Sequence, residues 1–115
     1  MIAVIFEVIP HVEYKQRYLD IAADLKPTLE KLDGFISVER FQSLSDQSKI
    51  LSLSFFRDEE AILHWRKLPD HRNAQSMGRD QIFEHYRLRV AGVVRDYGMI
   101  ERDEAPMDSQ AIHTN

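Results

Sequence analysis

Cysteine is absent from this chain of 115 residues, and its absence excludes several kinds of site. There can be no disulfide, no thiolate nucleophile and no cysteine-ligated zinc or iron–sulfur centre. Long apolar runs are absent too, and none approaches the roughly 20 residues of a membrane-spanning helix. The N-terminal stretch MIAVIFEVIPH lacks the basic start and the small-residue cleavage site of a signal peptide. We therefore expect a cytoplasmic protein that does not enter a membrane.

Basic charge is in short supply as well. The net charge is −4, and most of the negative excess lies in residues 101–115, where four acidic side chains accompany a single Arg102. The rest of the chain is nearly neutral. Nucleic-acid phosphates require a basic patch on the protein, so we expect no nucleic-acid partner. A chain of this length fits one domain with a single core.

The apolar pattern of the first half predicts a strand, a long helix and a hairpin. Residues 2–9 are apolar on both faces apart from Glu7, which is typical of a covered strand. A helical spacing of apolar residues begins near Glu13 and ends at Gly34. Two alternating stretches, Phe35–Leu44 and Lys49–Phe56, flank a polar turn and predict an antiparallel hairpin.

The second half predicts helix and then strand. Asp58 is placed as an N-cap, and the buried stripe of the following helix includes Trp65. Pro69 restarts a helical run over residues 70–84, and an alternating strand follows over Arg87–Tyr97. The acidic residues 99–115 lack periodicity, so we expect a flexible tail or an arm on a partner subunit.

The predicted order is β-α-β-β-α-β, an α+β, ferredoxin-like fold with helices on one face of an antiparallel sheet. The other sheet face also carries apolar residues and needs a cover. A second copy of the same face would bury it, and symmetric dimers are the commonest oligomers. We therefore predict a homodimer.

Three stretches of residues 54–98 resemble a known family: SFFRDEEAILHW, LPDHRNAQSMGR and FEHYRLRVAGVVRDYG. The chain is similar there to the antibiotic biosynthesis monooxygenase (ABM) family of the dimeric α+β barrel superfamily. It closely resembles a bacterial subgroup with W-R-x-x-x-x-H-R-x-A-Q followed by Y-R-x-R-V. The resemblance implies an ABM-like domain over residues 1–98 and a separate tail over residues 99–115. Family members include cofactor-free oxygenases of polycyclic phenols, haem degraders and proteins without an assigned activity.

The residues themselves suggest a pocket for a planar apolar ligand between the helices and the sheet. Trp65 and Phe83 are candidates for its aromatic wall, and Trp65 would stack on a ring. His71 is the first candidate for a catalytic base, because its ordinary pKa lies near neutrality, and Glu7 is the second. Gln75 or Arg40 could hold an oxyanion formed by the substrate.

Haem degradation fits the same residues poorly. The family's haem degraders resemble this chain at Trp65, but their iron-binding His is replaced here by Gln75, a very poor axial ligand. They also place an Asn in the first strand, where the nearest polar residue is Glu7. Histidine pairs with metal-binding spacing, H-x-H or H-E-x-x-H, are absent. We therefore expect neither haem nor a metal.

The expected activity is that of a small dimeric oxygenase that acts without metal or organic cofactor on a small aromatic or quinol-like substrate. The alternative is a non-catalytic, stress-associated dimer that binds a small hydrophobic ligand. Simpler roles exist for each candidate residue. Trp65 could be plain core, His71 could serve the helix start, and Glu7 could lie in an ion pair on an open face. An arginine row (Arg87, Arg89 and Arg95) is expected to pair with Glu39 or the acidic tail.

Overall fold

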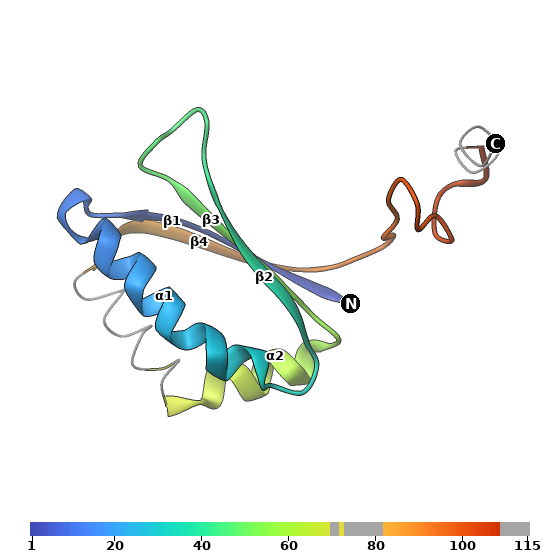
Figure 1. The fold of residues 1–115 in the computed structure, drawn as a ribbon, viewed down its shortest axis with the longest axis horizontal. Coiled ribbons are helices and arrows are strands. Elements are labelled where there is room, and N and C mark those ends of the chain that lie inside the picture. Colours follow the sequence, from blue (N-terminus) through green and yellow to red (C-terminus); the bar gives the residue numbers. More distant parts are fainter. Residues whose placement is uncertain (70–71, 73–81, 109–115) are drawn as a thin grey trace.

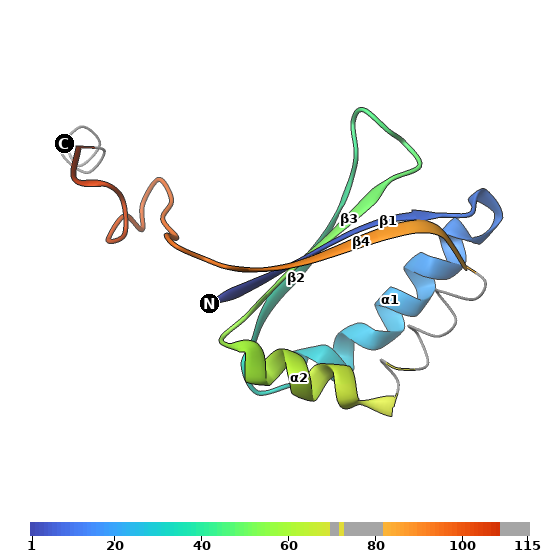
Figure 2. The same cartoon turned by 180° about the vertical axis from the view of Figure 1, so that it is seen from behind.

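The computed structural model describes residues 1–69, 72 and 82–108 and has two layers, a four-stranded sheet and the helices on one of its faces (Figure 1). Seen from behind, α1 and α2 still lie on the same side of the sheet (Figure 2). The elements follow in this order: β1 (Ile2–Pro10), a short 3-10 turn η1 (Val12–Tyr14), α1 (Lys15–Glu30), β2 (Phe35–Gln42), β3 (Ile50–Phe56), α2 (Glu59–Lys67) and β4 (Phe83–Gly92). The predicted α+β, ferredoxin-like architecture is confirmed.

All neighbouring strands of the sheet are antiparallel, in the order β2-β3-β1-β4. Because side chains alternate along a strand, the register gives the sheet two distinct faces. The face below the helices carries Val4 and Phe6 of β1, whereas Ile5 and Glu7 belong to the opposite face. We call that opposite face the open face.

The strand register shifts at two places, in the β2–β3 pairing and in the β1–β4 pairing, and each shift changes the sheet face on which a side chain lies. Between Phe35 and Ser37 the β2–β3 register shifts, so Phe35 packs under the helices, with its ring 5.9 Å from that of Phe56. Strict alternation along β2 would place Phe35 on the open face with Glu39 and Phe41, and the register shift places it on the opposite face instead. An extra residue in one strand moves the following side chains to the other face, and apolar alternation alone does not reveal it.

The helix boundaries have local causes. Gly34 follows α1 with a φ of +92°, in the left-handed region that glycine adopts without steric cost. Asp58 caps α2, because its carboxylate accepts a hydrogen bond of 3.0 Å from the Ala61 amide. Leu68, just after α2, is extended, as the residue before a proline usually is. The helix end predicted at Gly34 and the cap predicted at Asp58 are confirmed.

The last strand was placed wrongly. It begins at Phe83 and ends at Gly92, whereas the sequence predicted a strand over Arg87–Tyr97 and helix as far as Glu84. The pairing with β1 explains the true bounds. β1 begins at Ile2, which pairs with Gly92, and the Val93 amide donates to the Met1 carbonyl, so the hydrogen-bonded ladder between the two strands ends at this level.

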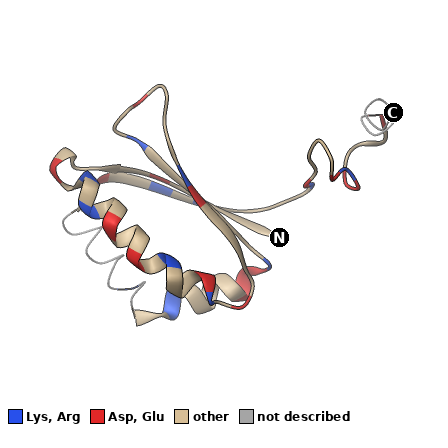
Figure 3. Cartoon of the chain, in the orientation of Figure 1, with Lys and Arg blue, Asp and Glu red and all other residues tan. Residues whose placement is uncertain are grey.

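The core lies between the helices and the sheet in two clusters. One is built on Val8, Tyr18, Ile50 and Ile82, and the other on Leu29, Phe56 and Ala61. Phe56 and Ala61 are each 2% exposed. Basic and acidic residues follow one another along α1 (Figure 3).

Residues 94–108 extend away from the sheet and helices (Figure 1). Short contacts close the segment on itself: the Arg102 guanidinium donates to the Gly98 carbonyl at 2.9 Å and lies over the Tyr97 ring. The Gly98 amide donates in turn to the Glu101 carbonyl. The segment is thus locally folded while it stands apart from the body.

Candidate functional site

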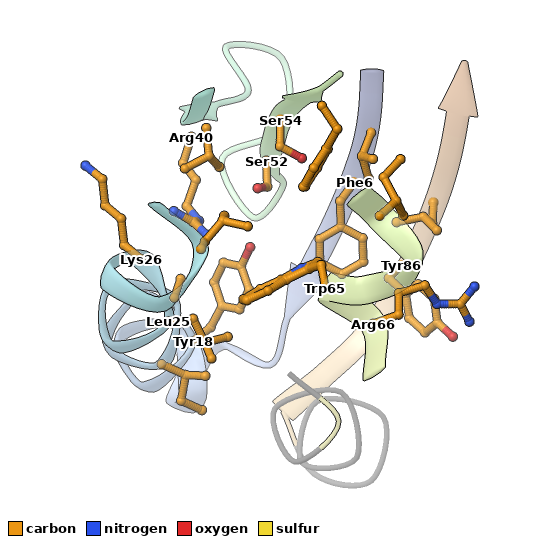
Figure 4. Close-up of a pocket in the computed structure, with 18 of the residues that line it drawn as sticks. Phe6, Tyr18, Leu25, Lys26, Arg40, Ser52, Ser54, Trp65, Arg66 and Tyr86 are labelled. Carbon is orange, nitrogen blue, oxygen red and sulfur yellow. The ribbon is translucent and has the colours of Figure 1, made fainter. Parts of the chain in front are cut away.

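A cavity of about 460 Å³ lies between the sheet and the two helices (Figure 4). Ligand pockets in proteins typically measure about 300–1,000 Å³, so a small organic molecule would fit. All four strands, α1 and α2 contribute to the lining. The sequence predicted a pocket in this place.

Side chains of the sheet form the floor of the cavity in cross-strand rows. One row runs from Arg40 on β2 through Ser52 and Phe6 to Leu88 on β4. The next runs from Val38 through Ser54 and Val4 to Val90. The hydrogen-bonding side chains of these two rows therefore lie on β2 and β3, whereas the β1 and β4 positions are apolar.

Aromatic rings form much of the apolar wall. Phe83 lies 5.7 Å from both Phe6 and Tyr18 and 5.9 Å from Tyr86, measured between ring centroids. These separations fall within the range of favourable aromatic pairs. Phe83 and Tyr86 share the cavity face only because the β1–β4 register shifts between Ile9 and Pro10. Figure 4 shows the Trp65 ring reaching from α2 across the same space.

A polar corner, defined by Arg40, Tyr18, Ser52 and Ser54, lies at the β2–β3 side of the cavity. In Figure 4 the Arg40 guanidinium lies beside the Tyr18 hydroxyl, and both serine hydroxyls point into the same space. Burial raises the pKa of the Tyr18 hydroxyl, and the charge and hydrogen bonding of Arg40 offset part of that rise. Tyr18 therefore stays protonated at neutral pH and can act as a hydrogen-bond donor.

The predicted site residues separate in the structure. Trp65, Phe83 and Arg40 line one cavity, as the candidate site requires. Glu7 lies on the open face, where it accepts a hydrogen bond of 2.8 Å from Arg89 and lies 3.9 Å from Lys49. The bond from Arg89 is the main cause of a lowered pKa for the Glu7 carboxyl. The arginine row was expected to pair with Glu39 or the tail; for Arg89 the partner is instead Glu7.

His71 and Gln75 lie outside the described residues. Two other histidines of this half of the chain, His64 and His85, are exposed. His64 lies 4.0 Å from Glu60, one turn earlier on α2.

Sequence reasoning missed Tyr18, Ser52 and Ser54. Tyr18 belongs to the apolar stripe of α1, and a buried tyrosine in such a stripe is usually packing. The serines carried a usable signal, because they share the parity of Phe56 and alternate with Leu51, Leu53 and Phe55. A strand apolar on one face and polar on the other normally turns its polar face to water, so a polar cavity floor was not expected.

A comparison with models of protein families shows to which family the chain belongs. The family model described as "Antibiotic biosynthesis monooxygenase" matches residues 1–77. This chain belongs to the antibiotic biosynthesis monooxygenase family. The resemblance drawn from the sequence motifs is therefore confirmed, and the matched part includes Arg40 and Trp65.

Two curated proteins and one solved structure extend this comparison. Jasmonate monooxygenase ABM of Pyricularia oryzae is 48% identical over 93 residues, which cover 81% of this chain and 43% of that protein. The uncharacterized protein YqjZ of Bacillus subtilis is 32% identical over 83 residues, covering 72% of this chain and 65% of YqjZ. The chain thus spans less than two thirds of either relative. The structure of Rv0793 from Mycobacterium tuberculosis superposes with a TM-score of 0.76 at 14% identity, over 84% of this chain and 98% of that one, and shows a shared fold.

The part of this ABM-family chain that the structure describes holds neither a metal-binding cluster nor a membrane-spanning helix. Among those residues, no group of three or more His, Asp or Glu side chains is arranged to hold a metal ion. No helix within the same ranges is both long and apolar enough to cross a membrane.

Proposed function

We propose that this protein is a monooxygenase that oxidises a small aromatic or quinol-like substrate inside the cavity, without metal or organic cofactor. The observation that carries the proposal is an apolar, aromatic-walled cavity of about 460 Å³ with one polar corner, in a chain of the ABM family. An apolar, water-poor site suits a substrate anion that reacts directly with oxygen. Cytoplasmic residence is part of the same proposal.

The chemistry needs a substrate that supplies its own electrons. Removal of a phenolic proton gives an electron-rich anion, and this anion reduces oxygen. When a hydroquinone becomes a hydroxyquinone, one ring C–H becomes C–OH, the two phenolic C–OH groups become C=O, and the second oxygen atom leaves as water, so one O₂ takes up the four electrons that the substrate loses. Atoms and electrons then balance with no external reductant.

The residues have distinct proposed roles. Trp65 stacks on the substrate ring, Phe83 closes the apolar wall, and Arg40 holds the oxyanion. His71 is the proposed base, and Gln75 remains a second candidate for contact with the oxyanion. Glu7 was the second candidate for the base, but its hydrogen bond to Arg89 on the open face favours a structural role.

The Pyricularia oryzae relative supports an oxygenase and suggests a second substrate to test, jasmonate. Insertion of oxygen into a C–H bond to give an alcohol and water consumes two electrons that the substrate does not provide. An assay with jasmonate therefore includes a two-electron reductant, and the quinol assay omits it. The need for a reductant separates the two reactions.

Oxygen uptake tests the proposed function. The protein is mixed with a panel of hydroquinones, uptake is corrected for autoxidation, and labelled O₂ identifies the product oxygen. We expect His71→Ala to lose at least about a hundredfold in rate, as removal of a general base does. Trp65→Ala should lose activity as well, and the exposed His64→Ala should retain it. Uptake unchanged by both the His71 and Trp65 substitutions would refute the site. Ligand binding with no uptake on any substrate would favour the non-catalytic alternative.

The proposed assembly is a homodimer built on the open face. Its centre is apolar, with Ile5 and Leu53 as cross-strand partners and Leu51 and Phe55 flanking them on β3. Its rim is charged and includes Glu7 and Arg89. An apolar centre with a polar rim is the usual anatomy of a protein interface, and a two-fold axis would bring two copies of this face together.

A further inference from the structure

We propose that the cavity selects ligands that carry a carboxylate, which Arg40 binds in the polar corner while the apolar body of the ligand lies over β1 and β4. The cavity's role as a substrate site rests on the proposed function. The preference for an anion rests on three observations: the basic side chains that line the cavity, the Nε of Arg40, unpaired among the described residues, and the separation of polar and apolar side chains on the cavity floor.

Charge is the first argument. Within the described residues, the cavity lining includes three basic side chains and no acidic one: Lys26, Arg40 and Arg66. In Figure 4 the charged groups of Lys26 and Arg66 point away from the cavity, whereas the guanidinium of Arg40 lies against it. A cation facing an apolar cavity with no described carboxylate beside it favours an anionic ligand.

Unsatisfied hydrogen bonding is the second argument. The Nε atom of Arg40 is buried and has no hydrogen-bond partner among the described residues. Buried N–H groups in proteins are nearly always paired, because an unpaired one loses its water without compensation. A carboxylate has two acceptor oxygens and matches the planar fork of a guanidinium, so it would satisfy this donor.

The division of the floor is the third argument. Ser52 lies directly across from Arg40, and Ser54 is two residues further along the same strand. The hydroxyls of Ser52 and Tyr18 can donate to the same anion that Arg40 binds. On the far side of the floor, Phe6, Leu88 and Val90 present only apolar atoms. A ligand with an acidic end and an apolar body matches this division, whereas a uniformly apolar one would leave the polar corner unsatisfied.

The experiment compares acids with their methyl esters under anaerobic conditions, so that no turnover occurs. The probes are jasmonate and methyl jasmonate, with 4-phenylbutyrate and its methyl ester as a second pair. Trp65 is the only tryptophan and lines the cavity, so its fluorescence reports binding. We expect the wild-type protein to bind at least one acid about tenfold or more tightly than its ester, as a charge-assisted hydrogen bond would produce.

The variant Arg40→Gln should abolish that preference and change ester affinity by less than about threefold, because the ester has no charge to lose. Arg17→Gln is the matched control, since it removes the same charge from an exposed position next to Tyr18. Circular dichroism checks that each variant is folded. If Arg40→Gln does not fold, Ser52→Ala takes its place and should reduce the preference in part.

Three results would overturn the inference: equal binding of acid and ester by the wild type, equal losses for both in Arg40→Gln, or no response of Trp65 to any probe. This binding assay needs no oxygen and fails independently of the oxygenase assay. Acid preference without oxygen uptake would leave the carboxylate site standing and refute the proposed reaction. Oxygen uptake without acid preference would support the proposed reaction and refute the carboxylate site.

Discussion

Arg89 donates a hydrogen bond of 2.8 Å to Glu7 across the open face of the sheet, on the side away from the helices. The pair is diagonal, since the direct partner of Arg89 is Ile5 and that of Glu7 is Arg87. Lys49 lies 3.9 Å from the other carboxylate oxygen, so two cations approach one anion. The charge that looked out of place in an apolar strand is thus paired at the surface, outside the cavity.

This pair makes stability depend on pH in a defined direction. Arg89 lowers the pKa of Glu7 below its usual 4.5 in the folded protein. Ionised Glu7 therefore stabilises the fold above its unfolded pKa, and that contribution disappears as the pH falls through the lowered value. We expect Glu7→Gln to be less stable than wild type near neutral pH and nearly equal to it once the carboxyl is protonated. Urea unfolding near neutral pH and in acid, at one protein concentration, checks this expectation. The control is Glu59→Gln, which changes an exposed residue of α2. A gap between wild type and Glu7→Gln that persists in acid would contradict the linkage.

The sequence predicted the fold well because its determinants are local. Apolar alternation, the helical spacing before Gly34 and the cap at Asp58 each need only a few neighbouring residues to be recognised. The end of the last strand was wrong because it depends on a distant partner. The alternation of Val90 and Val94 continues past Gly92, but the pairing with β1 ends where Gly92 meets Ile2.

The site was less predictable for the same physical reason. Trp65, Arg40 and Phe83 were chosen for their chemical type, and all three line the cavity. Phe83 shares a face with Tyr86 only through a register shift that single-strand alternation does not reveal. The polar corner combines Arg40 of β2 with Ser52 of β3 and Tyr18 of α1, and only tertiary packing brings those three elements together.

Gly34 is the position where an added methyl group should cost most stability. Its φ is +92°, and a Cβ built there would lie 2.7 Å from the Cβ of Ala61, which is itself 2% exposed. The left-handed conformation alone costs other residues about 1–2 kcal/mol. We expect Gly34→Ala to lower the free energy of unfolding by at least this amount, measured by urea denaturation. Gly98→Ala is the control: a Cβ there meets no atom within 4 Å, and we expect a change within about 0.5 kcal/mol. Equal stability of the two variants would refute the steric account of this turn.

The open face predicts how the protein assembles. Leu53 lies at its centre, between Ile5 of β1 and Glu39 of β2. A carboxylate placed there would be buried unpaired between two copies, and burial of an unpaired charge is strongly unfavourable. We expect wild type to scatter light as a dimer at micromolar concentration and Leu53→Glu to scatter as a monomer. Leu63→Glu carries the same change on the outer side of α2, where Leu63 is 48% exposed, and should remain dimeric. A monomer mass for the wild type would refute the proposed dimer.

The ring and the hydroxyl of Tyr18 have different roles in the cavity, and a substitution can distinguish them. Its ring packs 5.7 Å from Phe83, while its hydroxyl lies in the polar corner beside Arg40 (Figure 4). Tyr18→Phe keeps the ring and removes only the donor. If the hydroxyl binds the carboxylate, the affinity for the acid should fall about tenfold, as expected for a lost hydrogen bond to a charged group. The methyl ester and the thermal midpoint should change little. Tyr14→Phe, at a position that is 38% exposed, is the matched control and should bind both probes normally. Trp65 fluorescence titrations of wild type and both variants with the acid and its ester distinguish the two outcomes. Equal losses for acid and ester in Tyr18→Phe would assign the residue to packing alone.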